Sequence, residues 1–165
     1  MESEGGSDVG ARYFDLWEAG GKSPFEIVRY THPDKLIVLF ASDAEDINRA
    51  FIYGMVVLRG VDALTPPEMV DAVRKYVELR RQIRERKAPG YPYGFRDDRG
   101  LSISTPSVVA KVFSDSRGIT VTYYATEAAS TELSINGQML GQPRIGLRRH
   151  VLKLEAQQAG YFILE

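Results

Sequence analysis

Carboxylates and aromatic residues that could do chemistry gather in the first 20 residues of the chain. The segment SEGGSD carries Glu4 and Asp8 on either side of two glycines. Glycine lets a backbone approach a ligand closely because it has no Cβ. A carboxylate can exchange a proton with a reacting group or accept a hydrogen bond from a hydroxyl. Glu4 is therefore a candidate catalytic residue and Asp8 a candidate binding residue, and the alternative for Glu4 is a solvated acid near the chain end.

A second group of acids brackets an aromatic residue. Asp15 and Glu18 flank Leu16 and Trp17, and Tyr13 lies just before them. Aromatic rings offer a large apolar face, so Tyr13 and Trp17 are candidate ligand-binding residues that would stack on a ring. The same pattern is typical of a buried helix face whose acids point into water. Both interpretations stay open from the sequence.

The composition argues against metal and thiol chemistry. The chain has no cysteine, which excludes disulfides, thiol nucleophiles and cysteine-based metal sites and leaves the compartment undetermined. His32 and His150 lie far apart, and the segment RDDRG at residues 96–100 has too few ligands for calcium. We expect no metal and no cofactor.

Charge and hydropathy argue against nucleic-acid and membrane partners. The 21 Lys and Arg residues nearly balance 22 Asp and Glu residues. Seven basic residues fall within residues 74–87, but Glu78 and Glu85 interrupt them at helical spacing, which predicts a solvated, salt-bridged helix face. No apolar run approaches the roughly 18 to 20 residues that span a bilayer.

The first half of the chain alternates between strand and helix signals. The run KLIVLF at residues 35–40 predicts a strand covered on both faces, and MVVL at 55–58 a second one. Between them, Ser42 and Glu45 have the spacing of a capping box, which explains Ser42 better than a catalytic role for Ser42 or Asp43. We expect the two strands to be parallel neighbours joined by a helix over residues 42–53.

A long helix follows and then the hydrophobic period changes. Thr65, two prolines and Glu68 predict the start of that helix, and the proline-rich segment 88–94 predicts its end and a domain boundary. Beyond it, residues alternate with period 2 in five segments, and Asn136 with Gly137 favours a two-residue hairpin turn. The segments are 107–113, 118–125, 130–135, 150–155 and 160–165. They predict an antiparallel sandwich packed on the long helix.

Taken together, these stretches resemble a known family. The segments SEGGSD, RYTHPDKLIVLF and the arginine-rich helix leading to GFRDDRGL are similar to the closing part of the (β/α)8 barrel in glycoside-hydrolase-like proteins, and the β region resembles their C-terminal sandwich. The fold class implied is α/β plus all-β: a partial (β/α) barrel segment at residues 1–90, followed by a small antiparallel β-sandwich at 91–165.

The resemblance also implies a function. It implies a carbohydrate-active enzyme whose first five or so βα units are absent, so that Met1 need not be a natural start. Barrel enzymes carry their working residues after the strand ends, which would make Glu4 catalytic and Asp8, Tyr13 and Trp17 sugar-binding. Glycosidases use two carboxyl groups, of which this chain supplies part, so we expect no turnover from the chain alone.

Two further expectations concern partners. A freestanding glycan- or protein-binding sandwich, with the α/β part as its support, is the alternative function. A few strands of a barrel expose unpaired backbone groups at a sheet edge, which predicts self-association through that edge.

Overall fold

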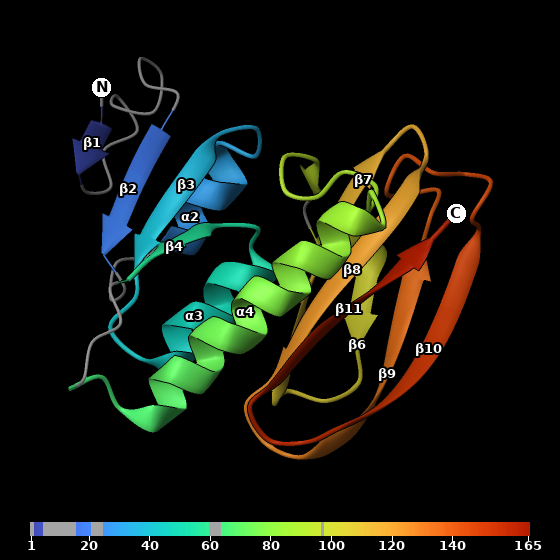
Figure 1. Cartoon of the computed structure of the whole chain (residues 1–165). Coiled ribbons are helices and arrows are strands. Elements are labelled where there is room, and N and C mark those ends of the chain that lie inside the picture. Colours follow the sequence, from blue (N-terminus) through green and yellow to red (C-terminus); the bar gives the residue numbers. More distant parts are fainter. Residues whose placement is uncertain (1, 5–15, 21–24, 60–63, 97) are drawn as a thin grey trace.

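The computed structural model describes residues 2–4, 16–20, 25–59, 64–96 and 98–165, with the backbone alone at 2–4, 16–20, 25, 26 and 28 (Figure 1). These residues form a mixed α/β structure with three helices and three sheets. One sheet is parallel and lies in the first part of the chain; the other two are antiparallel and follow the longest helix.

The parallel sheet has its strands in the order of the sequence. Its four strands are β1 (Glu2–Glu4), β2 (Leu16–Gly20), β3 (Leu36–Phe40) and β4 (Val56–Leu58). Helix α2 (Phe25–Thr31) connects β2 to β3, and α3 (Ala44–Ile52) connects β3 to β4. The expected parallel pairing of the strands near residues 35–40 and 55–58, through one helix, is confirmed.

Both predicted helix caps are one residue away from their observed positions. Helix α3 begins after Asp43, whose side chain accepts a hydrogen bond from the Asp46 amide at 2.9 Å. The Asp46 carboxylate in turn accepts from the Ser42 amide at 2.8 Å. Aspartate caps helices as well as serine does, so the exact end of β3 decides between the two neighbours. The expected Ser42–Glu45 box is therefore wrong by one position.

The long helix α4 (Pro67–Glu85) likewise begins after Pro66 rather than Thr65. The Pro66 carbonyl accepts hydrogen bonds from the Met69 and Val70 amides at 3.0 and 3.1 Å. Proline fits the first turn of a helix because it lacks an amide hydrogen that would go unused there.

The segment after α4 lies against the antiparallel part. The Thr120 hydroxyl donates to the Pro89 carbonyl at 2.8 Å, and the Ser114 amide donates to the Gly94 carbonyl at 2.8 Å. Gly90 has φ +72°, and a Cβ there would come within 2.4 Å of the Ser114 nitrogen. Only glycine allows so close an approach.

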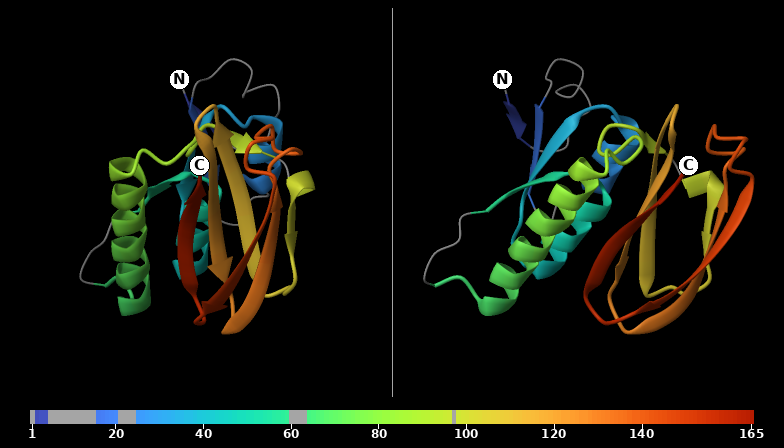
Figure 2. Two further views of the ribbon diagram at one scale, coloured as in Figure 1. Left: turned by 90° about the vertical axis from the view of Figure 1, so that its right-hand side faces the viewer. Right: turned by 45° about the vertical axis from the view of Figure 1, so that its right-hand side comes forward.

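Two antiparallel sheets follow (Figure 2). One has the order β11-β8-β7-β5 and the other β10-β9-β6, with a short 3-10 helix η1 (Asp98–Gly100) before β6. The strands are β5 (Phe95–Arg96), β6 (Leu101–Ile103), β7 (Val108–Asp115), β8 (Gly118–Ala125), β9 (Ala129–Asn136), β10 (Leu147–Leu154) and β11 (Gln158–Leu164). All five predicted strands are present, and the short β5 and β6 are additional.

Buried side chains from both antiparallel sheets pack together, as in a sandwich. Val112 and Val121 of one sheet share a cluster with Leu133 and Ile135 of the other. The predicted two-residue turn at Asn136 is wrong, because β10 starts only at residue 147. The Asn136 side chain instead accepts hydrogen bonds from the Gln138 and Met139 amides and starts a longer loop.

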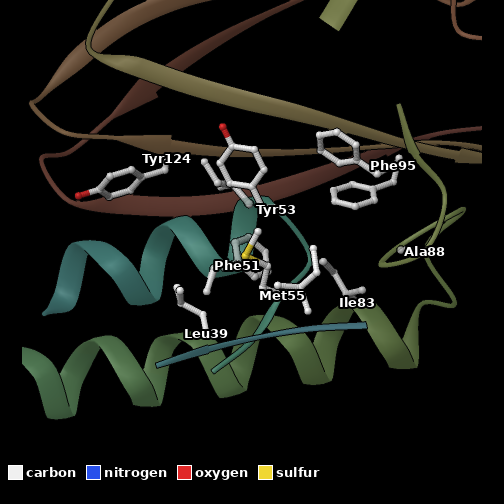
Figure 3. Packing of buried hydrophobic residues seen from close by; sticks show 12 residues of the cluster. Leu39, Phe51, Tyr53, Met55, Ile83, Ala88, Phe95 and Tyr124 are labelled. Carbon is white, nitrogen blue, oxygen red and sulfur yellow. The ribbon is translucent and has the colours of Figure 1, made fainter. Parts of the chain in front are cut away.

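Helix α3 packs more closely on the antiparallel sheet than α4 does. Figure 3 shows α3 between α4 and the strands, with Phe51, Tyr53 and Met55 in the space around it. The Thr122 hydroxyl of β8 donates to the Ile52 carbonyl at 2.8 Å. The expected packing of the sandwich on the long helix holds in part: Ile83 of α4 shares the buried cluster with the strands, and α3 makes the closer contact with the sheet.

The central hydrophobic cluster joins both parts of the chain. Its buried members come from β3, α3, α4, β5, β7 and β8, among them Leu39, Ile83, Phe95 and Tyr124 (Figure 3). The cluster thus contains residues from both sides of the predicted boundary at residue 90. The division into domains at 1–90 and 91–165 stays a prediction.

Candidate functional site

The carboxyl ends of the parallel strands meet at one edge of the sheet. The strands end at Glu4, Gly20, Phe40 and Leu58. In parallel α/β sheets, ligands bind outside these strand ends because the connecting loops converge there. A hollow of about 440 Å³ lies at this edge and is lined by Phe40, Ala41, Ser42, Leu58 and Arg59.

Two glutamates occupy neighbouring positions close to the edge. Glu4, the last residue of β1, is the register partner of Glu18 in β2. Neighbouring strands lie about 4.8 Å apart, so the backbone brings these two carboxyl-bearing residues side by side. The pairing was not predictable from a sequence separation of fourteen residues, because strand register is a tertiary property.

The aromatic candidate Trp17 lies in the same strand as Glu18. It is the register partner of Ser3 on one side and of Ile37 on the other. Residues 16–20 form a strand, so the alternative interpretation of this stretch as a helix face is wrong. The candidates Asp8 and Tyr13, together with Asp15, lie outside the described residues.

Sequence reasoning missed the apolar side chains at the edge. Phe40 is 42% exposed and Leu58 is 50% exposed, whereas Ile37 and Leu39 of β3 are fully buried. The run KLIVLF had predicted cover on both faces, but in the described part of the chain only the Ile37–Leu39 side is buried under helices. Arg59 was also missed, although it lies directly after the end of β4, where parallel α/β sheets often carry binding residues.

This edge combines apolar surface with a cation and two nearby glutamates. Such a set suits a ligand that has hydroxyl groups and apolar ring faces, since arginine donates hydrogen bonds and carboxylates accept them. Across the described ranges, no cluster of three or more histidine, aspartate or glutamate residues could hold a metal ion. Nor is any helix in those ranges long and apolar enough to cross a membrane.

A second set of ionisable groups lies away from this edge. The Lys111 ammonium donates to the Asp98 carboxylate and to the Tyr30 hydroxyl, each at 2.6 Å, and Tyr30 donates to the same carboxylate oxygen at 2.6 Å. The ring centroid of Tyr53 is 5.2 Å from the Lys111 nitrogen. Burial and the nearby Asp98 charge raise the pKa of Tyr53 to about 12. This network connects α2, η1 and β7, and its geometry indicates a structural role.

Comparisons with known proteins give no relative: no family model, no curated protein and no solved structure matches the chain.

Proposed function

We propose that the chain forms the closing part of a carbohydrate-active, glycoside-hydrolase-like (β/α)8 barrel with its C-terminal sandwich. Its sugar site would lie at the carboxyl edge of β1 to β4. The observation that carries the proposal is the register pairing of Glu4 with Glu18 next to this edge.

The topology of the parallel sheet supports the barrel. Its strands follow one another in sequence order without a reversal among the described strands. Right-handed crossovers that always step in the same direction place their helices on the same face of the sheet. A doubly wound sheet would instead reverse its strand order and carry helices on both faces.

The paired glutamates suit the chemistry of glycoside hydrolysis. A retaining glycosidase holds two carboxyl groups about 5 to 5.5 Å apart, one to attack the sugar and one to protonate the leaving oxygen. Residues paired across adjacent strands are separated by about 4.8 Å at the backbone, which fits this requirement. Phe40 would stack on a sugar ring, and Arg59 would donate hydrogen bonds to its hydroxyls. Without the remaining strands of a barrel, the site would bind weakly and give no turnover.

A glycan titration followed by NMR tests the proposal. We expect neutral oligosaccharides of a mixed panel to shift the amide signals of Gly20, Ala41 and Arg59, and an Arg59→Ala variant to weaken the response. Arg74→Ala, which changes an exposed cation on α4, is the matched control and should leave the response unchanged.

The same titration discriminates between the two candidate functions. Shifts confined to the loops of the antiparallel sheets would refute the edge site and support the freestanding sandwich module. No response to any glycan would refute the edge site and a glycan-binding sandwich, and would leave only the protein-binding form of the alternative. Hydrolysis of aryl glycosides by the chain alone would contradict the expectation that it has no turnover.

A further inference from the structure

A hollow lined by thirteen described residues lies beside α4, away from the strand ends. Its volume is about 690 Å³, which is within the usual size of a small-molecule site. Its walls combine aliphatic and aromatic residues, including Val56, Tyr76, Ile83, Tyr91 and Tyr93. Five cationic residues also line it, and no lining residue is an acid: Arg80, Arg81, Arg84, Lys87 and Arg117.

Five of the seven basic residues at 74–87 form two groups that the sequence could not separate. Arg74 pairs with Asp71 at 2.6 Å, and Arg81 pairs with Glu78 at 2.8 Å and with Glu85 at 3.3 Å. This first group is the salt-bridged face that the sequence predicts.

The second group consists of Arg80, Arg84 and Lys87. Arg80 and Arg84 are one helical turn apart on α4, Lys87 follows the end of the helix, and all three line the hollow. None of them forms an ion pair with another described residue. Three cations on an apolar wall without an acid form a site that attracts negative charge.

The Arg80 guanidinium is held in place by neutral groups. It donates to the Tyr91 hydroxyl at 3.1 Å and lies 5.1 Å from the Tyr91 ring centroid and 5.9 Å from that of Tyr76. Tyr91 is itself anchored, because its hydroxyl donates to the Phe51 carbonyl at 2.9 Å. A guanidinium has five N–H donors, so most of those on Arg80 are available to a ligand oxygen.

We propose that this hollow binds a small organic anion built on a ring. The ring lies against the tyrosine and aliphatic walls, and its phosphate or carboxylate group binds Arg80, Arg84 and Lys87. Charge alone would favour any anion, but the apolar walls add affinity only for a ligand that also has a ring to bury. This site is separate from the proposed glycan site at the strand ends.

Isothermal titration with four probes tests the proposal. Glucose 6-phosphate and glucuronate carry a ring together with a phosphate or a carboxylate. Glucose carries the ring alone, and inorganic phosphate carries the anionic group alone. We expect at least one of the two ring anions to bind at least about tenfold more tightly than glucose or inorganic phosphate. The double variant Arg84→Gln/Lys87→Gln should lose at least about tenfold of that affinity.

The controls separate this site from general charge and from the edge site. Arg74→Gln removes a cation from the same helix outside the hollow and should leave the affinity unchanged. Amide shifts on binding should map to α4 and residues 87–93 rather than to Gly20 and Ala41. Saturable binding in the hollow beside α4, with no glycan response at the strand-end edge, would support this inference. The same result would refute the proposed function.

Four outcomes would overturn the inference. These are binding of both ring anions no tighter than that of inorganic phosphate, equal loss in the Arg74→Gln control, no saturable binding by either ring anion, and much tighter binding of a single-stranded oligonucleotide. The last result would identify the cations as a nucleic-acid surface.

Discussion

At the scale of single residues, buried polar side chains fix the backbone where elements meet. Arg29 is fully buried and donates to the carbonyls of Pro33, Lys35 and Gly54 at 3.0 to 3.2 Å. Burial lowers the pKa of Arg29 to about 10, so the side chain remains charged at neutral pH. Through these carbonyls Arg29 holds α2, β3 and the turn before β4 together, and its local sequence does not predict this role.

Asp115 holds the β7–β8 hairpin and gives the first prediction. Hydrogen bonds from Arg117, and another from the Gly90 amide, lower its pKa to about 2. A folded pKa below the ordinary value of about 3.9 means that the stabilisation is complete above that pH and is lost as the pH falls toward 2. We expect Asp115→Asn to lower the free energy of unfolding by about 0.5 to 1 kcal/mol at pH 7, since the pair is partly exposed.

Denaturant unfolding between pH 7 and pH 2 measures this difference. The gap between wild type and variant should shrink below about pH 4 and be nearly closed at pH 2. Glu132→Gln is the control, because its partner Arg149 is 3.9 Å away and both side chains are exposed. A gap that is constant over this range would show that the Asp115 charge does not contribute.

At the scale of elements, the free side of β4 is occupied by a side chain. The Tyr76 hydroxyl of α4 donates to the Met55 carbonyl at 2.8 Å and accepts from the Val57 amide at 3.2 Å. These two backbone groups flank Val56 on the last strand of the sheet. A neighbouring strand would use the same donor and acceptor, so Tyr76 blocks pairing at this edge. Self-association through the edge stays a prediction, and Tyr76 is the residue that opposes it.

Tyr76→Phe should unblock the edge. We expect the free energy of unfolding to fall by about 1 to 3 kcal/mol, because two backbone groups lose their partner. Hydrogen exchange at the Val57 amide should accelerate, and sedimentation should show more self-association than in wild type. Tyr93→Phe, on an exposed tyrosine, is the control. Unchanged Val57 protection and an unchanged oligomeric state would refute the blocking role.

At the scale of the whole molecule, the Lys111 network ties the α/β part to the antiparallel part. The Lys111 side chain is 8% exposed and that of Asp98 is 42% exposed. Removing the acid leaves a buried cation without its counter-charge, whereas removing the cation leaves an acid that can still reach water. The two single variants should therefore differ strongly.

We expect Asp98→Asn to cost about 2 kcal/mol of unfolding free energy and Lys111→Met about 1 kcal/mol or less. The double variant should be more stable than Asp98→Asn alone, because no buried charge then remains. Chemical denaturation of the three variants measures this order. A cost for Lys111→Met equal to or above that for Asp98→Asn would contradict it.

Local patterns in the sequence predict the helices and strands of this protein. The apolar run before Ala41 and the alternating segments after residue 100 predict their strands, because hydrophobic period and turn residues act over a few neighbours. Helix starts were found to within one residue, since Ser42 and Asp43 are equally good caps and only the end of β3 selects between them. These signals need no knowledge of distant residues.

Contacts between distant parts of the chain set which elements meet and which residues form sites. The register of β1 and β2 placed Glu4 beside Glu18, and the packing of α3 under β8 left α4 outside with Arg80 and Arg84 along a hollow. Pairing, packing and charge complementarity depend on groups far apart in the chain. These contacts form together when the shared hydrophobic core packs, and a local sequence pattern does not specify them.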